Sequence, residues 1–210
     1  MNETVAAGVV GVGSMGRNHA RVYGELPGVD LVGVADRDAS AAERVADTYD
    51  TRAMGTEELL GIADAVSVVV PTPAHYDAVT ACIEAGVDVL VEKPFVADPD
   101  RGRELDRYAR EAGVTLQVGH VERFNPAVRV VDDIVPDLDV IAVDARRLGP
   151  PIDRAVDDSA VLDLMIHDLD VVFSLLGARP ATVDATGAHD NRYATASCRF
   201  EDGTVATFTA

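Results

Sequence analysis

One residue type that can do chemistry occurs only once in this sequence. Lys93 is the single lysine among 18 basic residues, and it lies in Glu92-Lys93-Pro94 directly after an apolar segment. A lysine supplies a compact ammonium with movable donors, where an arginine supplies a fixed planar fork. Such an ammonium can hydrogen-bond a hydroxyl and stabilise the alkoxide that develops as a hydride departs. The pattern therefore indicates a catalytic lysine, with the chance survival of one exposed lysine as the alternative.

A carboxylate and an imidazole lie one helical turn apart in the second half of the chain. Asp163 and His167 fall within an apolar helical pattern over 159–176, so their side chains are expected to share one face. A histidine oriented by a neighbouring carboxylate can act as a general base. Taken alone, such a pair is more often structural, and Asp170 on the same face is expected to tie the helix down. No further His or Cys is suitably spaced, so no metal site is expected.

A glycine-rich turn follows the first apolar segment. Gly11-Val12-Gly13-Ser14-Met15-Gly16 matches the dinucleotide fingerprint, in which glycines allow a tight turn, close approach of a pyrophosphate and packing of helix on strand. The helix that begins there presents amide donors to the phosphates. Asp36 lies 20 residues past Gly16, where a carboxylate accepts ribose hydroxyls and disfavours a 2′-phosphate. The motif thus favours NAD, although Arg37 could pair with the extra phosphate of NADP.

The fold expected for the first part of the chain places the glycine turn and two further loops at one edge of a sheet. Over residues 1–121, short apolar runs alternate with helical patterns, which predicts a Rossmann domain with a doubly wound parallel sheet, an α/β fold. Pro71, Thr72 and His75 follow one buried strand, and Glu92 and Lys93 follow another. Ligands bind beyond the carboxyl ends of parallel strands, so these residues are all expected at the cofactor. For His75 the alternative is a helix-start residue bonded to local backbone.

The pattern changes after residue 121. Residues 122–210 contain long helical patterns and then mostly antiparallel strands, which predict an α+β domain. The last strand reaches the end of the chain without a terminating signal, so this domain is expected to be incomplete. His120, Arg123 and Asn125 lie at the junction, where ligands often bind, and they are expected to contact a sugar or phosphate, or else to pack the junction. Three further arginines could counter an anionic substrate: Arg146, Arg147 and Arg154.

The charge balance narrows the possible partners. The chain has 210 residues, 36 of them acidic and 18 basic, for a formal net charge of −18. Such a surface repels nucleic acid and anionic membranes, so neither is expected as a partner. The acid excess indicates adaptation to a high-salt cytoplasm, or alternatively the codon usage of a high-GC genome. No signal peptide or membrane span is recognised, and Cys82 and Cys198 give no disulfide framework.

The order of these motifs resembles the glucose–fructose oxidoreductase / inositol dehydrogenase (Gfo/Idh/MocA) family. The resemblance extends over essentially the whole chain and rests on the glycine turn, Pro71-Thr72 with His75, Glu92-Lys93-Pro94, and Asp163 with His167. It implies that the second domain has an open-faced antiparallel sheet, commonly used for forming homo-oligomers. It also implies that Lys93 assists at the reacting hydroxyl, that Asp163 helps to hold the substrate, and that His167 is the general base.

The expected activity is an NAD(P)-dependent oxidation of a sugar hydroxyl. The stretches 120–126 and 161–170 look most like family members that oxidise C3 of UDP-N-acetylglucosamine or related nucleotide sugars. Alternatives are a cyclitol dehydrogenase and a non-catalytic regulator that senses NAD or a sugar on the same fold. The regulator has no need of a general base or a catalytic lysine, and this chain carries candidates for both.

Overall fold

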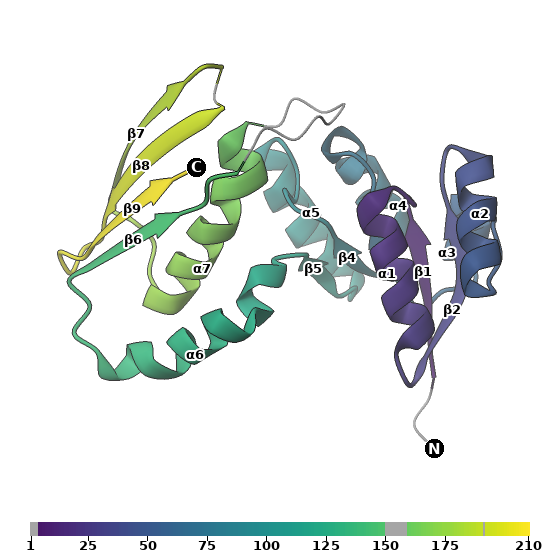
Figure 1. The fold of residues 1–210 in the computed structure, drawn as a ribbon. Coiled ribbons are helices and arrows are strands. Elements are labelled where there is room, and N and C mark those ends of the chain that lie inside the picture. Colours follow the sequence, from purple (N-terminus) through teal and green to yellow (C-terminus); the bar gives the residue numbers. More distant parts are fainter. Residues whose placement is uncertain (1–3, 150–158, 191) are drawn as a thin grey trace. The chain divides into compact units, whose positions relative to one another are not determined.

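A computed structural model describes residues 4–149, 159–190 and 192–210 (Figure 1). Arg154, one of the arginines proposed to counter an anionic substrate, lies outside these residues. The chain divides into two compact units, Met1–Gly119 and His120–Ala210, which we call unit 1 and unit 2. Each unit has its own sheet and its own core, so each is described separately.

Unit 1 is built on a five-stranded parallel sheet, which confirms the predicted Rossmann architecture. The strands lie in the order β2-β1-β3-β4-β5, and the order reverses between β1 and β3. Ligands of doubly wound sheets bind outside the carboxyl ends of the strands at such a switch point. The strands are β1 (Val5–Val10), β2 (Val29–Ala35), β3 (Ala65–Val68), β4 (Asp88–Val91) and β5 (Leu116–Val118).

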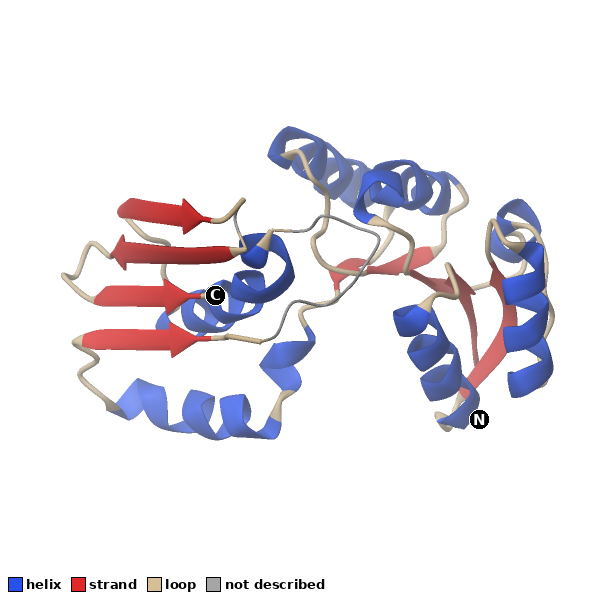
Figure 2. Cartoon of the chain, turned by 45° about the horizontal axis from the view of Figure 1, so that its top comes forward, coloured by secondary structure: helices blue, strands red, loops and turns tan. Residues whose placement is uncertain are grey.

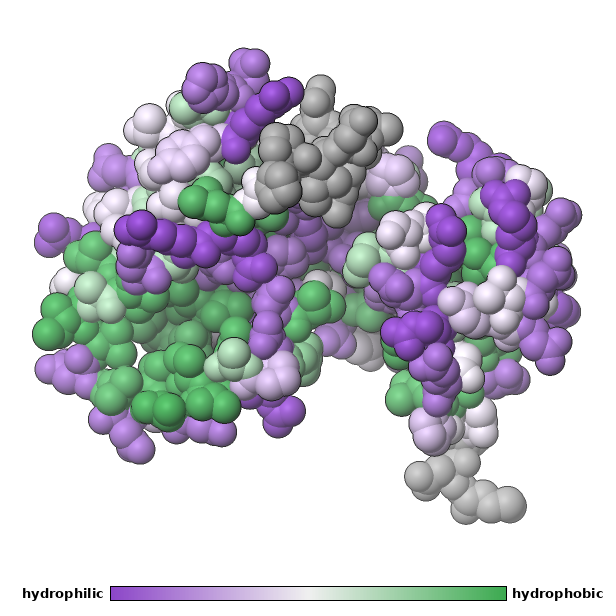
Figure 3. All heavy atoms as spheres, viewed as in Figure 1, coloured by the Kyte–Doolittle hydropathy of each residue, from purple (hydrophilic) through white to green (hydrophobic). Residues whose placement is uncertain are grey.

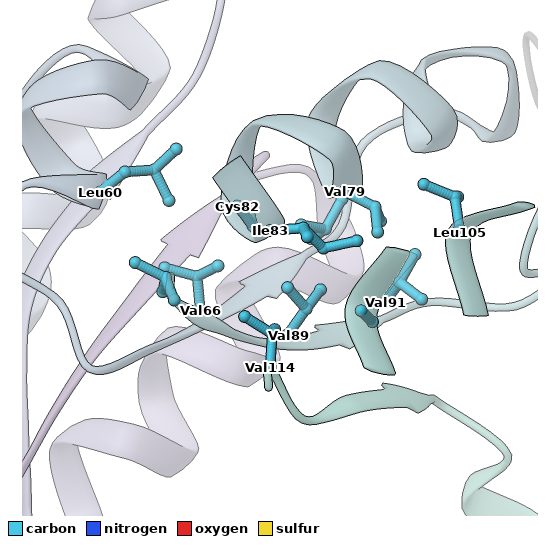
Figure 4. Close-up of a cluster of buried hydrophobic side chains, with 12 residues drawn as sticks. Leu60, Val66, Val79, Cys82, Ile83, Val89, Val91, Leu105 and Val114 are labelled. Atoms are coloured by element: carbon cyan, nitrogen blue, oxygen red, sulfur yellow. The ribbon is translucent and has the colours of Figure 1, made fainter. Parts of the chain in front are cut away.

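Helices pack on both faces of this sheet (Figures 1 and 2). In β3, Val66 and Val68 point to one face and join side chains of α4 and α5 in a buried cluster (Figure 4). The opposite face packs against α1 and α2. Between Val66 and Val68 in β3 lies Ser67, a polar residue that is fully buried in an otherwise apolar strand. The helices are α1 (Ser14–Glu25), α2 (Ala39–Tyr49), α3 (Thr56–Leu60), η1 (Thr72–Ala74), α4 (His75–Glu84) and α5 (Pro99–Ala112).

Unit 2 has a four-stranded mixed sheet in the order β6-β9-β8-β7, whose strands lie side by side in Figure 2. The pairs β7·β8 and β8·β9 are antiparallel, as expected, whereas β6 pairs with β9 in parallel. The segment Glu201-Asp202-Gly203 lies in the turn between β8 and β9. The strands are β6 (Ala142–Arg146), β7 (Thr182–Ala188), β8 (Tyr193–Arg199) and β9 (Val205–Thr209).

One face of this sheet carries the core of unit 2. Phe173 of the long helix packs edge-on against Phe200 and Phe208, with ring centroids 6.0 and 6.2 Å away. By contrast, α6 has no buried residue, and hydrophobic side chains gather on the surface over it (Figure 3). The helical segments of unit 2 are η2 (Val121–Phe124), α6 (Pro126–Ile134), η3 (Val135–Asp137), η4 (Val161–Met165) and α7 (Ile166–Leu176).

The prediction of a continuous α-helix over 159–176 was wrong for the first part of this segment. The segment η4 is a π-helical turn, and the α-helix α7 begins only at Ile166. Asp163 lies in the π-helical turn and His167 lies in α7, so the spacing rule for a regular α-helix does not apply between them. Such turns are frequent at functional sites, but their i→i+5 hydrogen bonds leave no recognisable signal in a single apolar sequence.

The turn between β1 and α1 is closely packed. A Cβ atom on Gly16 would lie 1.8 Å from the carbonyl oxygen of Gly11, which is backbone and has no room to move. Gly11 itself has a φ of +92°, and a Cβ there would lie 2.5 Å from the Val69 oxygen. Around Gly13 nothing lies within 4 Å of the equivalent position. Two of the three glycines are therefore required by the fold and the third is not.

We predict that Gly16→Ala lowers the free energy of unfolding by about 1–3 kcal/mol or more, because overpacking forces the backbone apart. This is opposite to the usual preference of helices for alanine over glycine. Gly13→Ala is the matched control and leaves the stability nearly unchanged. Denaturant unfolding of both variants measures the difference, and a Gly16→Ala protein as stable as the parent would contradict this packing argument.

Candidate active site

The glycine turn is held in place by the acidic residue that follows β2. The backbone N–H of Val12 donates to Oδ2 of Asp36 at 2.7 Å, and the N–H of Asp38 donates to Oδ1 at 2.9 Å. A carboxylate oxygen can accept two hydrogen bonds, so both oxygens keep capacity for ribose hydroxyls. Arg37 is exposed next to them. Asp36 therefore shapes the turn as well as offering the acceptor that the sequence predicted.

The start of α1 is open. Gly13, Ser14 and Met15 are exposed, and no side chain caps the first N–H groups of this helix. Uncapped amides at a helix N-terminus together with the positive end of the helix dipole favour a phosphate group. Together with the empty space beside Gly13, this arrangement fits the pyrophosphate of a dinucleotide.

The loop after β3 contains one exposed and one buried candidate. Pro71 is exposed, and Thr72 begins η1. His75 is only 1% exposed, and its Nδ1 lies 2.9 Å from the Pro94 oxygen while its Nε2 lies 2.8 Å from the Val70 oxygen. Of the two roles expected for His75, the structure supports the bond to local backbone. The ring joins the loop after β3 to the loop that carries Lys93.

Lys93 follows β4, at the same edge of the sheet as the glycine turn, because β1, β3 and β4 run parallel. The Lys93–Pro94 peptide bond is cis, and the Lys93 residue is partly buried. The preceding Glu92 is 8% exposed and turned inwards, with Oε1 3.0 Å from His19 Nε2. Burial alone would raise the pKa of Glu92, but the hydrogen bond and charge of His19, the Lys93 N–H and the Lys93 charge hold it below its usual value.

The sequence analysis missed the groups that surround Glu92. His19 and Tyr23 of α1 both reach Ser67 of β3, with distances to Ser67 Oγ of 2.9 and 2.6 Å. The Glu92 carboxylate completes this polar cluster through its contact with His19. The signals that could have revealed it were the serine inside a β-branched strand and the histidine and tyrosine spaced four apart on α1.

In unit 2, ionic contacts tie the segment η2 to α7. The Arg123 guanidinium forms a two-pronged pair with Asp170, with Nε 2.7 Å from Oδ2, and this pairing raises the pKa of Arg123. His120 Nδ1 lies 3.7 Å from the same carboxylate. Asp170 therefore ties α7 down, as predicted. The Arg123 side chain remains 48% exposed, so it keeps donors for a ligand.

A second set of contacts surrounds Glu122. Arg147 donates to Asp168 at 2.8 Å and to Glu122 at 3.3 Å. Asn125 donates from its side chain to Glu122 at 3.0 Å, while its Oδ1 caps α6 at the Ala127 N–H. The hydrogen bond from Asn125 and the charges of Arg147 and His167 lower the pKa of Glu122 against the effect of burial. Arg146, in contrast, pairs with Asp144 on the exposed face of the sheet.

Lys93 belongs to unit 1, and Asp163 and His167 belong to unit 2. Asp163 and His167 are both partly buried.

Among the described residues, no group of three or more His, Cys, Asp or Glu side chains is arranged to hold a metal ion. Within the same residues, none of the helices has the length and apolar character required to cross a membrane.

The fold and the open glycine turn define a dinucleotide-binding Rossmann protein with an appended α+β unit. Residues 5–120 match the oxidoreductase family with an NAD-binding Rossmann fold, and residues 142–210 match the GFO/IDH/MocA C-terminal domain. The chain therefore belongs to the Gfo/Idh/MocA oxidoreductase family, which confirms the resemblance drawn from its motifs. The family fold also confirms NAD as the expected class of cofactor.

Individual relatives agree with this assignment. The chain is 37% identical to a UDP-N-acetylglucosamine 3-dehydrogenase of Acidithiobacillus ferrooxidans, over 97% of this chain and 66% of that protein. It is 32% identical to an inositol 2-dehydrogenase of Rhizobium meliloti, over 88% of this chain and 59% of that protein. The chain thus spans less than two thirds of the length of either relative.

Two solved structures have the same fold. One is that of the Acidithiobacillus ferrooxidans enzyme, with a TM-score of 0.92 at 36% identity, covering 98% of this chain and 66% of that one. The other is GenD2 from gentamicin A biosynthesis in complex with NAD, with a TM-score of 0.90 at 28% identity, covering 99% and 65%.

We predict that Gly13→Ala weakens NAD binding about tenfold or more, equivalent to roughly 1.4 kcal/mol, because the added methyl group occupies the space expected for the pyrophosphate. Isothermal titration calorimetry measures the dissociation constant. Gly24→Ala, in the same helix and equally open around its Cβ position, is the control and keeps the parent affinity. Equal NAD affinity in the Gly13→Ala and Gly24→Ala proteins would refute the placement of the pyrophosphate.

Proposed function

We propose that this protein is an NAD(P)-dependent oxidoreductase that transfers a hydride between nicotinamide and a ring hydroxyl carbon of a sugar. The observation that carries the proposal is the edge of one parallel sheet, which bears the open glycine turn, Asp36 and the only lysine of the chain. That edge offers a cofactor site after β1 and β2 and an ammonium after β4, with β3 between them.

Each candidate catalytic residue has one task. Bound NAD supplies the acceptor for the hydride that leaves the carbon. Lys93 donates a hydrogen bond to the reacting hydroxyl oxygen and stabilises the negative charge that develops there. His167 takes the hydroxyl proton as general base while the carbonyl forms, and Asp163 helps to hold the sugar. The charge of His167 is among the causes that lower the pKa of Glu122, so the two side chains interact electrostatically.

For the substrate, we propose C3 of a UDP-N-acetylhexosamine. This rests on the similarity to the UDP-N-acetylglucosamine 3-dehydrogenase over nearly the whole chain. His120, Arg123 and Asn125 are the proposed contacts to the sugar. A cyclitol is the second candidate, supported by the similarity to the inositol 2-dehydrogenase.

A spectrophotometric screen of the intact protein at high salt, with nucleotide sugars, free sugars and cyclitols and with each nicotinamide, tests the reaction. Reduction of NAD by one of these substrates supports it. Nucleotide and sugar binding without any absorbance change at the reduced-nicotinamide wavelength would instead identify the non-catalytic sensor. High salt is chosen because we propose that the net charge of −18 is an adaptation to a salt-rich cytoplasm.

We predict that Lys93→Met lowers kcat by about 10²–10⁴-fold, because the charge at the reacting oxygen loses its donor. The dissociation constant for NAD changes little, since the adenosine and pyrophosphate contacts lie on other loops. Steady-state kinetics and calorimetry measure the two quantities. Arg107→Met, which removes an exposed cation of α5, is the control. Near-normal turnover in the Lys93→Met protein would defeat the catalytic assignment.

We also propose that the protein forms a homo-oligomer through the sheet of unit 2. One face of this sheet packs against α7, while exposed side chains such as Asp144, Ser197 and Arg199 alternate with the buried ones and point away from that helix. Within the described residues no helix packs on this polar face, which leaves it available to a second copy of the same sheet.

We predict that Ser197→Arg, in the central strand β8, shifts the protein to a smaller assembly, because a long side chain in place of a small one overpacks the centre of the proposed interface. Sedimentation velocity measures the change in mass. Ala112→Arg adds the same side chain at an exposed position of unit 1 and leaves the assembly intact. A parent protein that sediments as a monomer would contradict the proposed interface.

A further inference from the structure

A chain of partly buried hydrogen bonds connects α1 to β3 and to the end of β4 next to Lys93. Tyr23 Oη lies 2.6 Å from Ser67 Oγ, and Ser67 Oγ lies 2.9 Å from His19 Nδ1. On its other side, His19 Nε2 lies 3.0 Å from Glu92 Oε1. Ser67 has no exposed surface and Glu92 is 8% exposed, whereas His19 and Tyr23 are partly buried, so the cluster is largely but not fully shielded from solvent.

The donors of this cluster can be assigned from the carboxylate. An ionised Glu92 only accepts hydrogen bonds, so Nε2 of His19 carries a proton and donates to it. On the other side of the ring, Nδ1 pairs with the Ser67 hydroxyl, and the Ser67 hydroxyl also pairs with the Tyr23 hydroxyl. Each ring nitrogen thus has its own partner, so the His19 ring is oriented with Nε2 aimed at Glu92.

Glu92 in turn fixes the backbone from which Lys93 projects. Its Oε2 accepts from the Lys93 N–H at 3.2 Å, and its carboxylate packs against Gly119, where a Cβ would lie 3.3 Å from Oε1. On the far side of Lys93, the ring of His75 bonds the Pro94 oxygen. The backbone is thus held immediately before and immediately after the lysine.

We propose that His19 is a positioning residue for Lys93 and acts through Glu92. The proposal rests on the proposed function, because Lys93 is the residue assigned there to the reacting hydroxyl. His19 lies on α1, the helix whose start is expected at the pyrophosphate, so the same element serves the cofactor at one end and orients the lysine from its middle.

The kinetic test uses His19→Asn, whose shorter side chain cannot span Ser67 and Glu92. The variant is expected to lose kcat by about tenfold or more, because small misplacements at a reacting centre are costly. Its affinity for NAD and its KM change little. Added to Lys93→Met, the same substitution causes no further loss, since it acts through that lysine. His189→Asn, in the exposed turn between β7 and β8, is the matched control.

A second readout needs no substrate. Because Lys93 is the only lysine, acetylation by an N-hydroxysuccinimide ester modifies a single ε-amine. Peptide mass spectrometry measures its rate of acetylation relative to that of the N-terminal amine. The rate at Lys93 is expected to rise severalfold in His19→Asn and in Glu92→Gln, because the released loop exposes the amine, and to stay at the parent value in His189→Asn.

The outcomes separate the two proposals. Unchanged acetylation of Lys93 in the His19→Asn protein overturns the positioning role. The positioning role is also overturned if the His19→Asn protein has a lower melting temperature and a lower NAD affinity but keeps its kcat. That result would identify His19 as a purely structural residue. If Lys93→Met is fully active while acetylation still responds to His19, the link between the two residues stands and the proposed function fails.

Discussion

The parallel alignment of β1, β3 and β4 is the constraint on which the candidate site depends. Parallel strands deliver their carboxyl ends to one edge, and three segments far apart in sequence therefore meet there: the glycine turn, the Pro71-Thr72 loop and the loop of Lys93. The apolar strands and the helices on both faces serve to hold this edge. The chemistry is concentrated in loops, while the sheet beneath them is almost entirely aliphatic.

Much of this could be predicted from the sequence, because the signals are local. The βαβ alternation fixes a parallel sheet, and the glycine spacing and Asp36 are read within single segments. The cluster around Glu92 could not be predicted in the same way, because it joins His19, Ser67 and Glu92 across separate elements. For His75 the sequence left two roles open, and its contacts with the Pro94 and Val70 oxygens appear only in the tertiary structure. The π-helical turn at Asp163 is a matter of hydrogen-bond register, which residue types do not encode.

The two units organise their charged groups differently. In unit 1 the polar cluster is built around the buried side chains of Ser67 and Glu92, where hydrogen bonds are electrostatically stronger than in water. In unit 2 the contacts of Arg123 and Arg147 with acidic residues are partly exposed, and each arginine joins segments that are distant in sequence. Such pairs contribute little net stability but define geometry, here the arrangement of η2 against α7.

The hydrogen bond from Val12 to Asp36 has a consequence for coenzyme engineering. Because this carboxylate anchors the amide of the glycine turn, an exchange that admits a 2′-phosphate also removes the clamp on the loop that cradles the diphosphate. Asp36→Ala would at once relax the preference for NAD over NADP and loosen the glycine turn. A redesign toward the phosphorylated coenzyme must keep a neutral acceptor at this position, such as a serine or asparagine, and recruit the adjacent guanidinium for the added charge.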